Sequence, residues 1–385
     1  SDVREGEEFA AFEKYLKKLW FANGIHHHYS NDKFKPEFTE EWFREQLAQY
    51  INDENRQMDD ELLCQIIFDP TLYASRLNRS EGVDVIKASA GNYYEGVSQA
   101  EAEAFYTAMA EADKGNPEPI SYGLNSKLMR DTEGNIFENV WKVGGMYSAA
   151  IEQIVFWLEK AATVANPTQK EIIDALVKYY RSGDLKDFDA YNVLWVKDSA
   201  SNVDFVNGFI ENYGDPLGHK SSWEAVVNFR DEEACHRTEI MAANAQWFED
   251  NAPINPAYRK EEVKGVSAKV ITVAMLGGDC FPSTAIGINL PNADWIRKEH
   301  GSKSVTIDNI TYAYDKAAQG NGFMEEFVLR AEDRERLKKY GKLSDDLHTD
   351  LHECLGHGSG QLAEGVTGNE LRTYSSTLEE ARADL

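Results

Sequence analysis

The chain has 385 residues, of which 42% are hydrophobic and 11% aromatic, which is enough to bury an interior and favours two lobes over a single core. Its 40 basic and 66 acidic residues give a formal charge of −26, which argues against nucleic acid and anionic membranes as partners. The same charge can attract a cationic ligand, such as the protonated amino terminus of a peptide, or can serve solubility alone.

The first third of the sequence is predicted to be helical. Apolar residues recur at spacings of three and four in Glu7 to Trp20, Glu40 to Ile51, Asp59 to Ile67 and Ser98 to Asp113. Strands are expected next, because Ser126 to Val143 alternates in short apolar runs around the turn sequence Asp131-Thr-Glu-Gly-Asn135.

Helical periodicity returns from Tyr147 to Tyr180, where Pro167 marks the start of a second helix. We predict one long helix from Ser222 to Phe248, followed by a break at the prolines of Asn251 to Pro256. Val266 to Leu276 is rich in Val and Ile, and periodicity alone does not decide between a buried strand and an apolar helix. The remainder is predicted to be mostly helical, so the expected fold class is α+β and predominantly helical.

The most informative motif is Leu351-His-Glu-Cys-Leu-Gly-His357. Two histidines four apart on a helix, with a Glu after the first, hold zinc and polarise its water, but here His352 and His357 are five apart. On a regular helix, five residues leave the two rings about 140° apart. The motif therefore predicts a widened, π-type turn, for which Gly356 supplies backbone freedom, with both histidines as zinc ligands and Glu353 as catalytic base.

Other interpretations of this helix stay open. His348 and His352 are four apart, which is the natural spacing for a metal pair, yet His348 adjoins an apolar stripe of leucines and fits a capping or surface role. The two histidines of the motif could also be unrelated residues on one helix. The adjacent Glu and the internal Gly of the motif favour the metal site.

A catalytic zinc ion needs a third protein ligand and leaves a fourth position open. The candidate lies in Thr377-Leu-Glu-Glu-Ala-Arg-Ala-Asp384, where Glu380 and Asp384 share one face of a predicted helix. Glu380 is therefore the expected third ligand, and Asp384 is placed to orient a ligating histidine. Alternatively, Thr377 and Glu380 form a capping box, which needs no metal.

These motifs resemble those of the dipeptidyl peptidase III metallopeptidases, which carry HExxGH followed by an EExRA motif that ends in Glu or Asp. They stand here as His352-Glu-Cys-Leu-Gly-His357 and Glu379-Glu-Ala-Arg-Ala-Asp384. Further segments resemble the family along nearly the whole chain: Tyr122-Gly-Leu-Asn-Ser126, Trp141-Lys-Val-Gly-Gly145, Gly208-Phe-Ile-Glu211, Asp215-Pro216 and Gly287-Ile-Asn-Leu-Pro-Asn292. The chain is thus similar to exopeptidases that release dipeptides from the free amino end of oligopeptides.

The resemblance implies a role for each residue that matches a motif: His352, His357 and Glu380 as zinc ligands, Glu353 as base, and Glu379 and Asp384 as carboxylates behind the ligands. It also implies that Asn289 and Asn292 bind the N-terminal portion of the substrate, beside an extended segment that pairs with the peptide backbone. Asn292 could instead cap a helix at Trp295. A gapless count back from Gly208 places Asp204 where the family has an acidic residue for the substrate ammonium.

Three departures from the family pattern matter. Ala381 stands where the second motif usually has Cys, which should leave metal ligation unaffected. The same gapless count puts Val206 where well-studied members have an active-site Tyr. Members also continue for hundreds of residues beyond the second motif, where a His and an Arg act on the transition state and the substrate. We therefore expect this chain, which ends at Leu385, to be a fragment of a bacterial member.

The family fold implies two lobes around a wide cleft. Residues 1–224 are expected to form a mixed lobe with a small β-barrel, to which residues 273–294 return. Residues 225–272 and 295–385 are expected to form the helical, zinc-bearing lobe, truncated at its C-terminal end. Closure of the lobes over the peptide would exclude water.

The predicted function is a zinc-dependent exopeptidase that acts on oligopeptides. Two alternatives stay open: a zinc endopeptidase or aminopeptidase with the same metal site, and a peptide-binding fragment that hydrolyses little. Four scattered cysteines without a CxxC pair favour reduced thiols, namely Cys64, Cys235, Cys280 and Cys354. With no signal peptide and no run of about 18 apolar residues, a cytoplasmic location is expected unless an upstream segment is missing. The sequence leaves the oligomeric state open.

Overall fold

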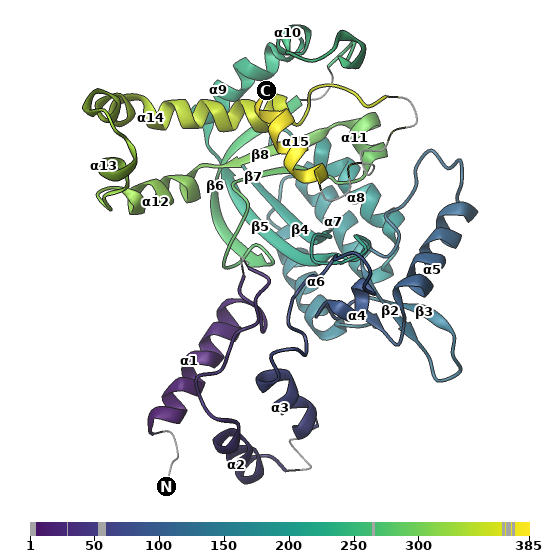
Figure 1. Ribbon diagram of the computed structural model, residues 1–385. Helices are drawn as coiled ribbons and strands as arrows, with labels where there is room; N and C mark the ends of the chain where they lie inside the picture. The colour runs from purple at the N-terminus through teal and green to yellow at the C-terminus, as the bar shows by residue number, and fades with distance from the viewer. Residues whose placement is uncertain are drawn as a thin grey trace.

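The structure is a computed structural model that describes residues 5–28, 30–52, 59–263, 266–363, 366, 371 and 374–385. It has the predicted α+β class, and about half of it is helical. Two sheets carry the fold, and helices pack around them (Figure 1). Among the described residues, no helix is both long and apolar enough to cross a membrane.

Three helices at the N-terminal end agree with the predicted segments: α1 (Glu7–Phe21), α2 (Glu40–Tyr50) and α3 (Asp60–Phe68). Their apolar faces meet in an aromatic cluster that buries Tyr15, Phe38 and Phe43. Thr39 and Asp59 cap α2 and α3, because their side chains accept hydrogen bonds from backbone N–H groups of the first turn. In Figure 1 these helices lie below the large sheet.

The smaller sheet and its flanking helices follow α3: α4 (Val85–Ala88), β1 (Tyr94–Glu95), α5 (Gln99–Ala112), β2 (Ser126–Arg130) and β3 (Ile136–Val140). The predicted hairpin is confirmed, since β2 and β3 pair antiparallel. The Asp131 side chain closes its turn by accepting hydrogen bonds from the backbone N–H groups of Glu133 and Asn135. A capping box of Ser98 and Glu101 begins α5.

The larger sheet has five strands in the order β4-β5-β6-β8-β7: β4 (Val203–Glu211), β5 (Ser222–Arg230), β6 (Val266–Gly278), β7 (Gly287–Leu290) and β8 (Ser302–Ile307). In the described part of the chain, β4 and β7 are opposite edges of an open sheet, so the predicted β-barrel is wrong. Closure into a barrel would need hydrogen-bonded pairing between β4 and β7. β7 is only 4 residues long, and Pro291, which follows it, has no N–H to donate.

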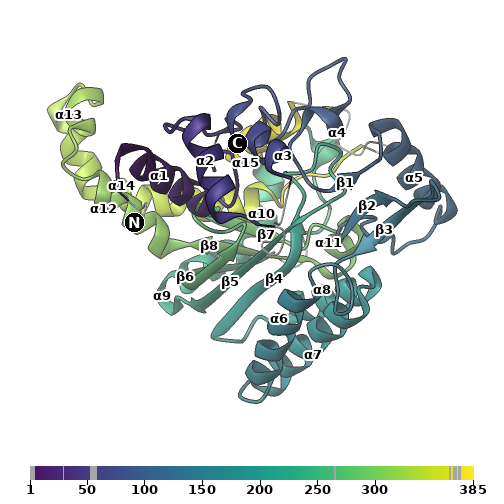
Figure 2. The same cartoon turned by 90° about the horizontal axis from the view of Figure 1, so that it is seen from below.

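Three helices cover one side of β4 and β5: α6 (Ser148–Ala162), α7 (Pro167–Ser182) and α8 (Leu185–Lys197), as Figure 2 shows. Pro167 is the first helical residue of α7, as predicted, and the Asn166 side chain caps this helix. The main core lies between these helices and the sheet, where it buries Tyr179, Tyr180 and Val226.

The long helix predicted from Ser222 to Phe248 is wrong. Its first third is the strand β5, which lies between β4 and β6, and the rest is divided into α9 (Glu232–Ala243) and α10 (Ala245–Asn251). In β5 the buried side chains alternate with less buried ones, and Asp231 then caps α9. Pairing with two neighbouring strands outweighs the helical pattern of this segment.

The rest of the chain is mostly helical, as predicted, apart from β7 and β8. Its helices are α11 (Asp294–His300), α12 (Asp308–Ala318), α13 (Phe323–Phe327), α14 (Ala331–Leu351), the wide turn η2 (His352–Gly356) and α15 (Ser375–Asp384). Residues 266–278 form the strand β6, which decides between the two alternatives for that segment. The predicted lobe boundaries fall within β5, β6 and α11, and the division into lobes stays a prediction.

Candidate metal centre

The two histidines of the motif lie on the predicted widened turn. The regular helix α14 ends at Leu351, and the backbone N–H of His357 then donates to the carbonyl oxygen of His352, five residues back, at 3.0 Å. The extra residue brings both imidazoles to one side of the turn, where their ring centroids are 4.6 Å apart. The prediction of a π-type turn is therefore confirmed.

Gly356 allows another helix to approach this turn closely. A Cβ atom at Gly356 would lie 2.2 Å from the carbonyl oxygen of Ala383, so only glycine leaves room for α15. Figure 1 shows α15 beside the end of α14. The expected backbone freedom is thus not the main reason for this glycine, since close packing requires it.

Packing of α15 on the turn places Glu380 beside both rings. One ligand atom each of His352, His357 and Glu380 lies within 4.8 Å of the others. Glu380 Oε2 is 3.2 Å from His352 Nε2 and 3.9 Å from His357 Nε2. Atoms bound to one tetrahedral zinc ion at about 2.0–2.2 Å stand a little over 3 Å apart. The spacing and the nitrogen and oxygen donor set therefore fit zinc.

Two further carboxylates hold the outer nitrogens of the rings. Asp384 Oδ1 is 2.8 Å from His352 Nδ1, and Glu379 Oε1 is 3.0 Å from His357 Nδ1. Burial alone would raise the pKa of Glu379, but hydrogen bonds from His357 and Arg382 lower it to about 2. Both carboxylates therefore favour a proton on Nδ1, which leaves Nε2 free to bind a metal.

The structure bears on the alternative roles of His348, Thr377 and Asn292. His348 is exposed and its Nε2 is 3.0 Å from Asp384 Oδ1, so His348, His352 and Asp384 form a second possible metal group that overlaps the first. The capping box is wrong, because α15 begins at Ser375 and Thr377 lies inside the helix. Asn292 does not cap α11 either, since the N-cap residue is Ala293.

Glu353 lies on the same turn and faces the sheet. A Cβ atom at Gly287, the first residue of β7, would lie 1.9 Å from Glu353 Oε1, so the carboxylate rests against the bare backbone of this strand. The backbone oxygen of Glu353 accepts a hydrogen bond from Ser304 Oγ at 3.1 Å. Burial raises the pKa of Glu353, although the two neighbouring histidines lower it in part. A carboxyl group with a raised pKa is suited to proton transfer.

Asn289 and Asn292 lie at the end of β7. The Asn289 side-chain oxygen is buried without a hydrogen-bond partner, and its backbone oxygen accepts from Arg297. Asn292 Nδ2 donates to Glu211 Oε1 at 3.3 Å, and Asn292 Oδ1 accepts from Arg297 at 3.3 Å. Asn289 therefore offers an unused acceptor, and Asn292 links β7 to the end of β4.

The structure does not bring Asp204 to the metal group. Its carboxylate is buried and accepts hydrogen bonds from Lys303 Nζ at 2.9 Å, Lys269 Nζ at 3.4 Å and Trp195 Nε1 at 3.1 Å. Val206 lies nearby in the main core. Two lysines already balance this carboxylate, and its expected role toward the substrate ammonium stays a prediction.

Two residues at the end of β4, Glu211 and Tyr213, were given no role from the sequence and interact with the candidate site residues. Burial raises the pKa of Glu211, which contacts Asn292. Tyr213 is exposed overall, but partial burial of its hydroxyl raises its pKa, and the negative charges of Glu211 and Glu380 raise it further. Glu211 already ends the segment Gly208-Phe-Ile-Glu211 that resembles the family, and Tyr213 follows it by two residues.

Comparison with known families agrees with these motifs. The sequence model described as Peptidase family M49 matches residues 100–383, which include the histidines and Glu380. The chain belongs to peptidase family M49. The resemblance noted in the sequence is therefore confirmed for most of the chain.

Named relatives of this M49 chain are considerably longer. Dipeptidyl peptidase 3 of Rattus norvegicus is 31% identical over 251 residues, which are 64% of the M49 chain and 32% of that protein. Dipeptidyl peptidase 3 of Homo sapiens is 27% identical over 265 residues, which are 68% of the M49 chain and 34% of that protein. The M49 chain thus spans about a third of the length of these curated relatives.

The fold of the M49 chain is also similar to a solved structure. Dipeptidyl-peptidase III from Corallococcus sp. strain EGB superposes with a TM-score of 0.63 at 25% sequence identity. The match covers 85% of the M49 chain and 61% of that chain.

Proposed function

We propose that this chain carries the catalytic centre of a zinc-dependent exopeptidase that releases dipeptides from the free amino end of oligopeptides. The observation that carries the proposal is the convergence of His352, His357 and Glu380 on one point, beside Glu353. Relatives named dipeptidyl peptidase 3 support the type of reaction.

We assign zinc to the Nε2 atoms of His352 and His357 and to the carboxylate of Glu380. Zinc held there would supply Lewis-acid chemistry, which activates a water molecule and stabilises the negative charge that develops on the scissile carbonyl oxygen. Asp384 and Glu379 keep the rings in the orientation and tautomer that ligation requires.

Glu353 is the proposed base. Its carboxylate accepts a proton from the attacking water and delivers it to the leaving amine, which requires a group that exchanges protons near neutral pH. The raised pKa of Glu353, caused by burial, supports this role. Its contact with Gly287 places it next to β7, an edge strand on which an extended peptide could pair.

We further propose that Glu211, Asn289 and Asn292 bind the substrate ammonium. The free side-chain oxygen of Asn289 and the carboxylate of Glu211 are acceptors that a protonated amine requires. Glu211 replaces Asp204 in this proposal, because two lysines already neutralise Asp204.

The expected two lobes are part of the proposal. The two lobes would close over the peptide and exclude water. One lobe would comprise residues 1–224 and 273–294, and the other residues 225–272 and 295–385. A cytoplasmic location also remains a proposal, and the buried free thiols of Cys64, Cys235 and Cys280 support it. The side chain of Cys354 lies outside the described part of the chain.

Cleavage of matched peptides tests the proposed reaction. The zinc-loaded chain is incubated with one oligopeptide bearing either a free or an acetylated amino terminus, and products are identified by mass spectrometry. We expect an N-terminal dipeptide from the free peptide and none from the acetylated one. Cleavage of the acetylated peptide at internal bonds would indicate an endopeptidase, and binding of peptide without cleavage would indicate a peptide-binding module.

A further inference from the structure

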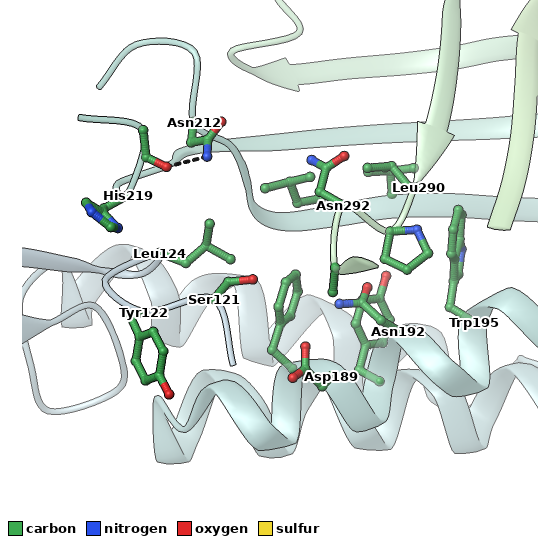
Figure 3. A pocket seen from close by; sticks show the side chains of 17 residues that line it. Ser121, Tyr122, Leu124, Asp189, Asn192, Trp195, Asn212, His219, Leu290 and Asn292 are labelled. Atoms are coloured by element: carbon green, nitrogen blue, oxygen red, sulfur yellow. Dashed lines mark hydrogen bonds between the residues drawn. The ribbon is translucent and has the colours of Figure 1, made fainter. Parts of the chain in front are cut away.

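A cavity of about 270 Å³ lies between α8, the edge strand β4 and the segment that follows β7 (Figure 3). Its apolar wall is formed by Leu124, Phe188, Val206, Ile210, Leu290 and Pro291. None of the three residues of the proposed zinc site lines it. The cavity is therefore distinct from the three proposed zinc ligands, although Asn292 lines it.

Two buried polar side chains of α8 line this cavity without partners. Asp189 and Asn192 are three residues apart on one face of the helix, with 7% and 8% of their surfaces exposed (Figure 3). Within the described residues, neither side chain makes a well-formed hydrogen bond. The indole N–H of Trp295 lies near Asp189 and lowers its pKa in part, but the indole nitrogen is itself buried without a hydrogen-bond partner. Buried polar groups are normally satisfied, so a ligand or ordered water is required here.

The cavity offers negative charge and no compensating positive charge. Among the described residues that line it there is no lysine or arginine, and burial lowers the pKa of the histidine, His219, which favours the neutral ring. Burial raises the pKa of Asp189 to about 7, and the negative charges of Glu118 and Asp184 contribute to the rise. Carboxylates and phosphates are therefore poor ligands, whereas a cation that donates hydrogen bonds would remove the cost of ionising Asp189.

We propose that this cavity binds a small organic ammonium ion with an apolar body, whose N–H groups bond to Asp189 and Asn192. Pockets that enclose drug-sized molecules measure roughly 300–1,000 Å³, so the ligand here is smaller, of the size of one aromatic ring with a short alkylamine chain. The ammonium lies against α8, and the ring lies against the apolar wall.

The cavity and the proposed peptide site are neighbours that share Asn292, which lines the cavity and also contacts Glu211. Val206, Ile210 and Asn212 point to the side of the strand that lines the cavity. Glu211 and Tyr213 point to the other side, where Glu211 contacts Asn292 and the charge of Glu380 acts on Tyr213. The inference does not rest on the proposed peptidase activity, because binding in this cavity needs neither zinc nor Glu353.

Calorimetric titration of the full chain with phenethylamine tests the proposal. 2-Phenylethanol and 3-phenylpropionate serve as neutral and anionic probes of the same shape. Asp189→Asn keeps the size of the side chain and removes its charge, and Asn192→Leu removes the second polar partner. Asp187→Asn is the matched control, since Asp187 lies on the same helix but pairs with Lys178 at 2.7 Å outside the cavity. Glu211→Gln reports any binding at the proposed peptide site.

We expect saturable binding of one phenethylamine per chain, weakened at least about tenfold by Asp189→Asn and by Asn192→Leu, as loss of a hydrogen bond to a charged group requires. Asp187→Asn should bind as wild type does, and both other probes should bind at least about tenfold more weakly. The proposal is overturned if phenethylamine shows no saturable binding, which would mean a water-filled cavity. It is also overturned if Glu211→Gln, and not Asp189→Asn, removes binding.

Discussion

At the scale of single residues, the metal centre is organised by carboxylates that contact the two imidazoles. Each histidine has one nitrogen facing Glu380 and the other facing its own acidic residue, Asp384 for His352 and Glu379 for His357. Glu353 has no such contact with a ring nitrogen and rests against Gly287. This difference in surroundings separates the carboxylates that hold the metal site from the one that can exchange protons.

Replacement of Glu353 by Gln should leave zinc binding intact and remove turnover. The variant keeps all proposed ligands but lacks a proton acceptor, and the loss of a general base lowers rates by roughly 100- to 10,000-fold. Zinc content by atomic absorption and peptide cleavage, measured on the same sample, check both parts. A variant that still cleaves peptides at a rate close to wild type would show that another group is the base.

Replacement of Asp384 by Asn, or of Glu379 by Gln, should weaken zinc binding roughly 10- to 100-fold, because the ring nitrogens lose their oriented acceptors. Competition with a chromophoric chelator measures the affinity. Asp345→Asn makes the same change of charge at an exposed position of α14 and should have no effect. Equal zinc affinities in all variants would contradict the proposal that Asp384 and Glu379 orient the two histidines.

The elements that could be predicted from the sequence are those whose signals are local. The helices α1 to α3 follow spacings of three and four, the hairpin of β2 and β3 follows its turn residues, and the wide turn η2 follows the five-residue spacing of the histidines. β5 could not be identified in this way, because Ser222 to Arg230 has no turn signal at its end and becomes a strand through pairing with β4 and β6.

The site residues can likewise be divided into those with a local sequence signal and those without one. The proposed zinc ligands lie within two short motifs, so their grouping follows from spacing once α15 packs on η2. The two lysine partners of Asp204 could not be found in this way, because they lie 65 and 99 residues away in the sequence. The cavity beside Asp189 had no signal at all, since its walls come from four separate segments.

Contact between η2 and α15 depends on Gly356. Replacement of Gly356 by Ala should push α15 away from the turn, because the new Cβ would lie 2.2 Å from the Ala383 carbonyl oxygen, and zinc affinity should fall with the displacement of Glu380. Gly341→Ala is the matched control: its Cβ meets only Leu337 at 3.9 Å, and alanine in a helix should stabilise the protein by about 1 kcal/mol. Unchanged zinc affinity in Gly356→Ala would show that the close packing is dispensable.

At the scale of the whole molecule, the charge of −26 includes carboxyl groups that the fold buries. Glu224 of β5 is 6% exposed, and burial, followed by the charge of Glu211, raises its pKa to about 7. A folded-state pKa above the unfolded one gives stability that is complete below about pH 4.5 and is lost as the pH rises to about 7. The fold should therefore become less stable over this range.

Replacement of Glu224 by Gln should remove this pH dependence. At about pH 8 the variant should be more stable than wild type by up to about 3 kcal/mol, the free energy that corresponds to a pKa near 7 instead of 4.5, and at about pH 4 the two should be alike. Urea unfolding at both pH values measures the difference, with the exposed Glu232→Gln as control. An equal gain at both pH values would show that packing, and not ionisation, is responsible.

The central claim is that both motifs assemble into one zinc site. The most direct test is the zinc content of the purified chain and of its Glu380→Ala variant after dialysis against dilute zinc, with Asp345→Ala as a control for lost charge. We predict one zinc ion per chain in the wild type and in the control, and a clear loss in Glu380→Ala. Equal zinc in all three proteins, or none in the wild type, would contradict the claim.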